Sequence, residues 1–95
     1  MTIQNITHFI TLVETKSAVK AAEICYTHDE LINLSIQQIE LIVGYELFLR
    51  RSNEHHKNTR VRLNILTEKG EILYKKARTL LDHYNEFLNM ANALK

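Results

Sequence analysis

The first part of the chain places its apolar residues with a helical period. They recur every three or four positions, at Ile3, Ile6, Phe9, Ile10 and Val13. Because this spacing puts them on one face of a helix, it predicts an amphipathic helix over residues 3–14. Thr15-Lys16-Ser17 then interrupts the pattern, and Ser17 can cap a second, short helix that ends near Ile24.

A third helix is predicted after the short connection at residues 25–27. Thr27 and Glu30 have the spacing of a capping box, in which the two side chains accept hydrogen bonds from free backbone N–H groups at a helix start. The apolar positions that follow share one face, at Ile32, Ile36, Ile39 and Val43. Gly44 suits the left-handed backbone that often ends a helix, so we expect the third helix to end there.

Two short segments with alternating apolar and polar residues predict a β-hairpin. Leu47-Phe48-Leu49 and Val61-Arg62-Leu63-Asn64-Ile65 have the pattern of strands, and the polar residues 52–59 join them. A hairpin in this place, after three helices, is expected to form a wing.

Thr67 is the expected cap of a long final helix. Its apolar positions are separated by alternating steps of four and three residues, at Leu73, Ala77, Leu80, Tyr84, Phe87, Ala91 and Leu94. This heptad pattern is typical of a helix that pairs with another along a narrow seam, and we predict a dimer interface at these residues. The alternative is that this face packs on its own domain. However, a helix of about 25 residues is about 38 Å long and extends beyond so small a core.

The composition favours a single small helical domain with one projecting helix. The chain has 95 residues, no proline and two glycines, and so few breakers predict a mainly helical fold. The single Cys25 excludes an internal disulfide and favours a reducing compartment. The sequence has no secretory signal pattern and no apolar run near the roughly 20 residues that a transmembrane helix needs. We therefore expect a soluble, cytoplasmic protein without a membrane partner.

The sequence lacks the residue patterns of a catalytic or metal site. Five histidines are scattered over several predicted elements, and the adjacent His55 and His56 lack the spacing of metal ligands. There is no glycine-rich phosphate loop and no nucleophile elbow. These observations argue against an enzyme, and we expect neither a metal nor a cofactor.

The charges are unevenly placed, although the formal net charge is only +1. Residues 28–44, which include the third predicted helix, contain three acids and no base. Residues 50–62 contain one acid, Glu54, and five bases, which are Arg50, Arg51, Lys57, Arg60 and Arg62. The basic stretch is either a contact for the phosphates of a nucleic acid or an ordinary solvated loop.

The order of the predicted elements, together with specific residues, resembles the N-terminal DNA-binding region of LysR-type transcriptional regulators. The matching residues are Phe9, Val13, Ser17, Ala21, Ala22, Glu23, Ile36, Glu40, Gly44, Leu47, Phe48, Leu66-Thr67-Glu68-Lys69-Gly70 and Ala77-Arg78. From Ser17 to Phe48 the register holds without a gap. The resemblance implies a mainly α-helical fold with a small β-hairpin, in which a winged helix-turn-helix precedes a long dimerisation helix.

The resemblance also implies a division of the chain and a function. Residues 1–66 form the winged helix-turn-helix domain, with the helix-turn-helix at about 18–43 and the wing at about 47–65, and residues 67–95 form the linker helix. In this family two chains pair through that helix, the third helix enters the major groove of double-stranded DNA, and the wing contacts the minor groove or backbone. Family members continue into an effector-binding domain. We therefore expect a bacterial, homodimeric transcriptional regulator without that domain.

Family geometry and side-chain chemistry together give a set of expected DNA contacts. The residues expected near phosphates are Ser17, Lys20, Thr27 and His28. The residues expected at base edges, where amide side chains can form paired hydrogen bonds with adenine, are Asn33, Gln37 and Gln38. The five bases of residues 50–62 are expected at the backbone or in the minor groove.

The third predicted helix departs from the family where arginines are common. Leu34, Gln37 and Gln38 stand at those positions, and Asp29 and Glu30 precede them. Each neutralised phosphate contributes nearly one unit to the salt slope of DNA binding, so the absence of three cationic contacts should weaken affinity by orders of magnitude. The same helix has a second apolar stripe away from the core stripe, formed by Leu31, Leu34, Leu41, Ile42 and Tyr45.

This second stripe supports an alternative function. An apolar helix face with anchors three or four residues apart suits a protein partner. On this hypothesis the chain is a repurposed winged-helix module that binds another protein, or one that pairs through its long helix with a full-length regulator and antagonises it. Packing of the extra leucines beneath the wing, or against the long helix of the same dimer, is a further alternative.

Overall fold

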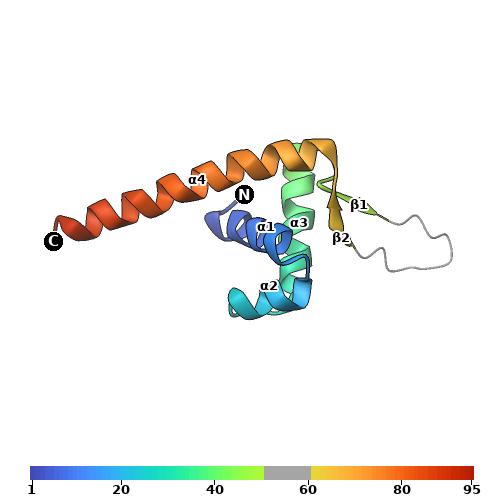
Figure 1. The fold of residues 1–95 in the computed structure, drawn as a ribbon, viewed down its shortest axis with the longest axis horizontal. Helices are drawn as coiled ribbons and strands as arrows, with labels where there is room; N and C mark the ends of the chain where they lie inside the picture. The colour runs from blue at the N-terminus through green and yellow to red at the C-terminus, as the bar shows by residue number, and fades with distance from the viewer. Residues whose placement is uncertain (51–60) are drawn as a thin grey trace.

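The computed structural model describes residues 1–50 and 61–95. The elements follow in the order α1 (Ile3–Thr15), α2 (Ala18–Ile24), α3 (Asp29–Val43), β1 (Phe48–Arg50), β2 (Val61–Leu66) and α4 (Glu68–Ala93). Figure 1 shows α1, α2 and α3 grouped below α4, which continues past them so that its C-terminal half projects alone. The fold class expected from the sequence, mainly α with a small hairpin and a long final helix, is confirmed.

Most of the predicted helix ends are found where the local chemistry places them. The Ser17 hydroxyl accepts a hydrogen bond from the backbone N–H of Lys20 at the start of α2. The Thr67 hydroxyl accepts from the N–H of Gly70 at the start of α4. Gly44 ends α3 with φ of 82°, a left-handed conformation that costs glycine little.

The capping box predicted at the start of α3 is wrong. The N-cap residue is His28, whose side chain makes no cap hydrogen bond. The N–H of Thr27 donates to the carbonyl of Ala22 at 2.9 Å, and Tyr26 before it has φ of 56°. Thr27 therefore belongs to the turn that closes α2, and α3 begins one residue later than a Thr27 cap requires.

The hydrophobic core lies where α1, α2 and α3 meet the start of β1 and the first half of α4. Its buried members are Phe9, Ile10, Leu12, Ala18, Ala21, Ala22, Ile32, Ile36, Ile39, Leu47, Phe48 and Ala77. The ring of Phe9 meets the ring of Phe48 edge to face, with centroids 6.0 Å apart. It meets the ring of Tyr74 on α4 in the same way at 6.4 Å. One aromatic side chain of α1 therefore joins the wing and the long helix to the helical bundle.

The start of α4 is fixed to the residues that precede β1. The carbonyl of Leu47 accepts from the backbone N–H of Thr67 at 2.9 Å and from its hydroxyl at 3.2 Å. The N–H of Leu47 donates to the Glu40 carboxylate of α3 at 2.8 Å. Leu47, which is fully buried, thus connects α3 and α4 through both its backbone groups.

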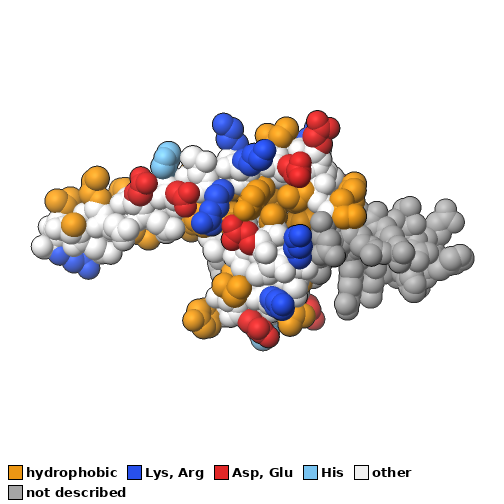
Figure 2. Space-filling view, in the orientation of Figure 1, with side chains coloured by type: hydrophobic (Ala, Val, Ile, Leu, Met, Phe, Trp, Pro, Cys, Tyr) orange, Lys and Arg blue, Asp and Glu red, His pale blue; other side chains and the backbone are white. Residues whose placement is uncertain are grey.

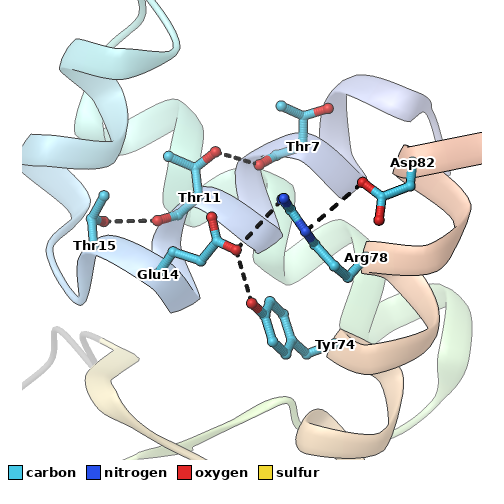
Figure 3. A network of polar contacts seen from close by, with 7 residues as sticks. All are labelled: Thr7, Thr11, Glu14, Thr15, Tyr74, Arg78 and Asp82. Carbon is cyan, nitrogen blue, oxygen red and sulfur yellow. Dashed lines mark hydrogen bonds and ion pairs between the residues drawn. The ribbon is translucent and has the colours of Figure 1, made fainter. Parts of the chain in front are cut away.

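A polar cluster connects α4 to α1, and Figure 3 shows its geometry. Oε2 of Glu14 accepts from the hydroxyl of Tyr74 at 2.9 Å and lies 3.5 Å from Nη1 of Arg78. Nε of Arg78 lies 4.0 Å from the Asp82 carboxylate, one turn further along α4. Burial, followed by the hydrogen bond to Glu14, raises the pKa of Tyr74. These contacts join α4 to the C-terminal end of α1.

The strands β1 and β2 form the antiparallel hairpin expected from the sequence. Phe48 lies opposite Leu66 and Arg50 opposite Val61, with a register shift between the two pairs. The shift is an irregularity of the kind that bends a hairpin and increases its twist.

Candidate nucleic-acid interface

The second and third helices form the helix-turn-helix unit on which a nucleic-acid interface depends. Ala21 and Ala22 of α2 are buried, and their small side chains allow α2 to lie close to its neighbours. The inner face of α3 is fully buried through Ile32, Ile36 and Ile39. On the opposite face of α3, the side chains of Leu31, Leu34, Gln37 and Leu41 are exposed.

A polar cluster between α1 and α3 fixes one side of the unit. His8 and Ser35 are both buried, and Nδ1 of His8 lies 2.7 Å from the Ser35 hydroxyl. Nδ2 of Asn5 donates to the same hydroxyl at 3.1 Å and to Oε1 of Gln38 at 3.2 Å. Burial lowers the pKa of His8, which favours the neutral imidazole that can share a proton with Ser35.

This cluster changes the role of one residue that was expected to contact bases. Gln38 is exposed, but its amide oxygen is occupied by Asn5, and the side chain is turned toward α1. Asn33 is half-buried and Gln37 is exposed, and no hydrogen bond of the structure engages either side chain within the described residues. Asn33 and Gln37 are thus the amide side chains of α3 that remain available to read a base edge.

Asn33 and Gln37 line a shallow hollow on the outer face of α3, with a volume of about 560 Å³. Its other lining residues are His28, Glu30, Leu31 and Leu34. His28 is exposed at the start of the helix, where the helix dipole favours an anion, but Oδ1 of Asp29 already accepts from the N–H of Glu30 at 3.0 Å. Asp29 and Glu30 occupy the same turn, and their carboxylates oppose that effect for an incoming phosphate.

The residues expected near phosphates at α2 have separate roles in the structure. The hydroxyl of Ser17 is the helix cap, whereas Lys20 is exposed and projects from the first turn of α2. Thr27 is half-buried in the turn between α2 and α3. Of these three side chains, that of Lys20 is the one whose charge and exposure suit a phosphate.

The predicted wing contacts fall partly on the strands. Arg50 is the last residue of β1, and Arg62 lies in β2. Arg51, Lys57 and Arg60 lie outside the described residues. In the sequence, these three residues lie between the last residue of β1 and the first residue of β2.

The apolar stripe predicted on the outer face of α3 is exposed over most of its length. Leu31 and Leu34 are each 45% exposed, Ile42 is 57% exposed and Leu41 is 84% exposed. Tyr45 differs, because its side chain is half-buried against the core and Nζ of Lys69 lies 5.1 Å from its ring centroid. The leucines and Ile42 therefore form a surface, whereas Tyr45 belongs to the junction with α4.

The predicted seam of α4 divides into two parts. Ala77 is buried in the domain's own core, and Leu73 is packed against it. Further along, Leu80, Tyr84, Phe87, Ala91 and Leu94 are exposed. Figure 2 shows hydrophobic side chains on the projecting half of α4, at the left of the view. The alternative prediction, that this face packs on its own domain, therefore holds for the first two positions, and the later ones remain free to pair.

Several residues that organise the interface could not be predicted from helical periodicity. Asn5 forms a capping box with Thr2 at the start of α1. This contact could have been predicted, because the two residues are three positions apart, as a capping box requires. The contacts of Ser35 with His8 and of Glu14 with Arg78 join positions far apart in the sequence, so local patterns do not reveal them.

The described part of the chain contains neither a metal-binding cluster nor a membrane-spanning helix. Within residues 1–50 and 61–95, no group of three or more His, Cys, Asp or Glu side chains is arranged to hold a metal ion. Across the same two ranges, no helix combines the length and the apolar character that crossing a membrane requires.

Comparison with known proteins gives matches in structure and none in sequence. No family model matches the chain, and no curated protein does. The structure is similar to the BenM DNA-binding domain in complex with the catB site 1 DNA, with a TM-score of 0.81 and 23% identity over 99% of this chain and 91% of that one. It is also similar to full-length OxyR from Pseudomonas aeruginosa (TM-score 0.78, 25% identity, 98% of this chain and 28% of that one). A third similar structure is CbnR, a LysR family transcriptional regulator (TM-score 0.77, 21% identity, 98% of this chain and 29% of that one).

These likenesses establish the fold. The chain has the winged helix-turn-helix and long helix found in the DNA-binding domains of LysR family regulators. It spans under a third of the full-length regulators that it matches.

Proposed function

We propose that the protein is a LysR-like, DNA-binding transcriptional regulator that acts as a homodimer in the cytoplasm. The observation that carries the proposal is the match of 99% of the chain to a domain whose structure was solved on DNA. The exposed outer face of α3 supports it, because α3 is the second helix of the helix-turn-helix and such a helix enters the major groove.

In this proposal α3 reads bases and other elements provide the cationic contacts. Asn33 and Gln37 form the paired hydrogen bonds with adenine, because an amide side chain can both donate and accept. Lys20 of α2 and the five bases of residues 50–62 neutralise phosphates, because α3 contains no lysine or arginine. His28 meets a phosphate at the start of α3. Gln38 takes a secondary part, since its amide oxygen is bound by Asn5.

The homodimer is proposed to form through the projecting half of α4. Leu80 is 50% exposed, Phe87 65% and Leu94 82%, and their heptad spacing puts them on one face. A cavity of about 120 Å³, lined mainly by apolar side chains of α1, α3 and α4, adjoins Leu80. Pairing along this face would remove a long apolar strip from water.

The DNA-binding proposal is tested by fluorescence anisotropy with a labelled duplex from the region upstream of the protein's own gene. We expect binding at low salt that weakens steeply as salt rises. The double variant Arg60→Gln and Arg62→Gln should reduce the slope of log K against log salt by about one unit for each phosphate that is no longer neutralised. The control variant, Lys75→Gln with Lys95→Gln, removes one exposed charge from α4 and one from the residue at the end of the chain, and it should leave the slope unchanged. Equal binding by both double variants would contradict the proposed contacts.

The dimer is tested separately by sedimentation equilibrium. Phe87→Glu places a charge in the proposed seam and should yield monomers, whereas Ile72→Glu changes a side chain of similar exposure, 59%, outside the seam. A wild-type chain that sediments or scatters as a monomer at working concentrations would refute the homodimer.

A further inference from the structure

The helix-turn-helix unit has an unusual charge for a surface that faces a polyanion. Between Ala21 and Leu49 the sequence contains five acids and no lysine or arginine. Asp29 and Glu30 are exposed in the first turn of α3, and Glu46 is exposed just beyond its last turn. A phosphate backbone along α3 would meet these carboxylates at both ends of the helix, whereas a cationic ligand would be attracted to them.

Exposed leucines lie between these acids, beside the amide side chains of Asn33 and Gln37. Leu34 and Leu41 lie two helical turns apart on the outer face of α3, and they are 45% and 84% exposed. Beside Leu34 is the hollow of about 560 Å³ already described, which Glu30 borders. Beside Leu41 is a second hollow of about 340 Å³, which Glu46 borders. Gln37 lines both hollows, so they are neighbours along the outer face of the helix.

The length of this helix face and the chemistry of its two hollows match one class of ligand. The 15 residues of α3 span about 22 Å, which is the length of a partner helix of about 15 residues. Apolar side chains at spacings of three and four on such a helix would fill the two hollows, and flanking lysines or arginines would face Glu30 and Glu46. Charge complementarity therefore distinguishes a cationic helix from an acidic one and from DNA.

We propose that the outer face of α3, from Glu30 to Glu46 with Leu34 and Leu41 at its centre, docks a cationic amphipathic helix of a partner protein. Docking covers Asn33 and Gln37, so partner and duplex compete for the same face. This inference goes beyond the proposed function and does not depend on it, because the acidic and apolar surface exists whether or not the chain binds DNA.

The test uses a fluorescein-labelled peptide of about 18 leucine and lysine residues, with leucines at positions i, i+3, i+4 and i+7, and anisotropy as the readout. The matched peptide has glutamate in place of every lysine. The protein variant is Leu34→Gln with Leu41→Gln, and its control is Ile72→Gln on α4, where the side chain is 59% exposed. A second pair of protein variants is Glu30→Gln and its control Glu71→Gln. The two are matched because both acids lie in the first turn of a helix, α3 and α4 respectively. Far-UV circular dichroism verifies that each variant is folded.

We expect saturable binding of one lysine peptide per chain. The double leucine variant should weaken it about tenfold or more, because it removes two central apolar anchors, whereas Ile72→Gln should leave it unchanged. Glu30→Gln should weaken it more than Glu71→Gln, and the difference should diminish at high salt. Saturable peptide binding without any duplex binding would refute the proposed function and support this inference.

Three results would overturn the inference. One is equal affinity for the lysine and glutamate peptides, and another is equal affinity of the double leucine variant and Ile72→Gln. The third is a change in self-association of the double leucine variant in sedimentation, since α3 would then be an interface between copies of this chain. Duplex binding that persists in any of these cases leaves the proposed function standing.

Discussion

Substitution of Gly70 by alanine tests the close approach that fixes α4 to the domain. Gly70 is buried in the first turn of α4, and a Cβ on it would fall well inside contact distance of the Leu47 carbonyl oxygen. The same Cβ would lie 3.0 Å from the Leu47 carbonyl carbon and 3.1 Å from the hydroxyl of Thr67. Both neighbours belong to the hydrogen-bonded junction, so relief requires a backbone shift of about 1 Å rather than a change of rotamer.

The expected loss of stability follows from two opposed terms. Alanine is favoured over glycine inside a helix by about 1 kcal/mol. Overpacking against backbone costs about 1–3 kcal/mol, and here it also strains the hydrogen bonds from Thr67 to Leu47. We expect Gly70→Ala to lower the free energy of unfolding by about 2 kcal/mol, which corresponds to a fall of about 10 °C in Tm for a domain of this size.

The measurement is urea unfolding followed by far-UV circular dichroism, with Gly44→Ala as the matched control. Gly44 has open space around it, and its φ of 82° alone should make alanine unfavourable, by about 1 kcal/mol. Both variants change the unfolded chain in the same way, so their difference compares two native-state costs, the close contact at Gly70 and the positive φ at Gly44. A Gly70→Ala protein as stable as the wild type, or more stable than Gly44→Ala, would show that the junction is not tightly packed.

Three further predictions concern the contacts around α1. Burial lowers the pKa of His8, so the folded state binds fewer protons than the unfolded chain, and its contribution to stability is present above about pH 6.5 and lost as pH falls. Replacement by asparagine should remove this part of the pH dependence of urea unfolding, and an identical pH profile in the variant would contradict it. Phe48→Ala should cost about 3–5 kcal/mol in thermal unfolding, because it removes a buried ring that packs edge to face on Phe9; a loss under 1 kcal/mol would mean that the wing is not part of the core. Arg78→Gln should lower the free energy of unfolding in urea by less than 1 kcal/mol, because both side chains of its ion pair with Glu14 are half-exposed. A larger loss would contradict this estimate of the contribution of the ion pair.

Much of the fold was predictable because it depends on local spacing. The periodic isoleucines of α3, the cap at Ser17 and the glycine at position 44 each specify an element through interactions within a few residues. The start of α3 was not predictable from Thr27. There the backbone bond from Thr27 to Ala22 closes the preceding turn, and this competes with the cap that the sequence offers.

The candidate site was predictable in outline and not in its contacts. The apolar and acidic character of α3 is visible in the sequence, and so is the absence of bases from it. The occupation of Gln38 by Asn5 is not, because the two residues are 33 positions apart and meet only when α1 packs against α3. Tyr45 was assigned to the outer stripe by helical periodicity, but the chain has already left α3 at Gly44, and the ring turns toward Lys69.

The distribution of charge separates base reading from phosphate binding in the proposed regulator. On α3, the groups suited to a duplex are the amides of Asn33 and Gln37, which read bases but neutralise no phosphate. The bases available for phosphates lie on α2 and at the wing, and the acids between residues 21 and 49 offset part of their attraction. Figure 2 shows Lys and Arg side chains interspersed with Asp and Glu on the face in view. On this proposal, a single domain would have a weak electrostatic hold on DNA. Two domains joined through α4 would double the phosphate contacts without adding any charge to α3, so useful affinity depends on the pairing of the long helices.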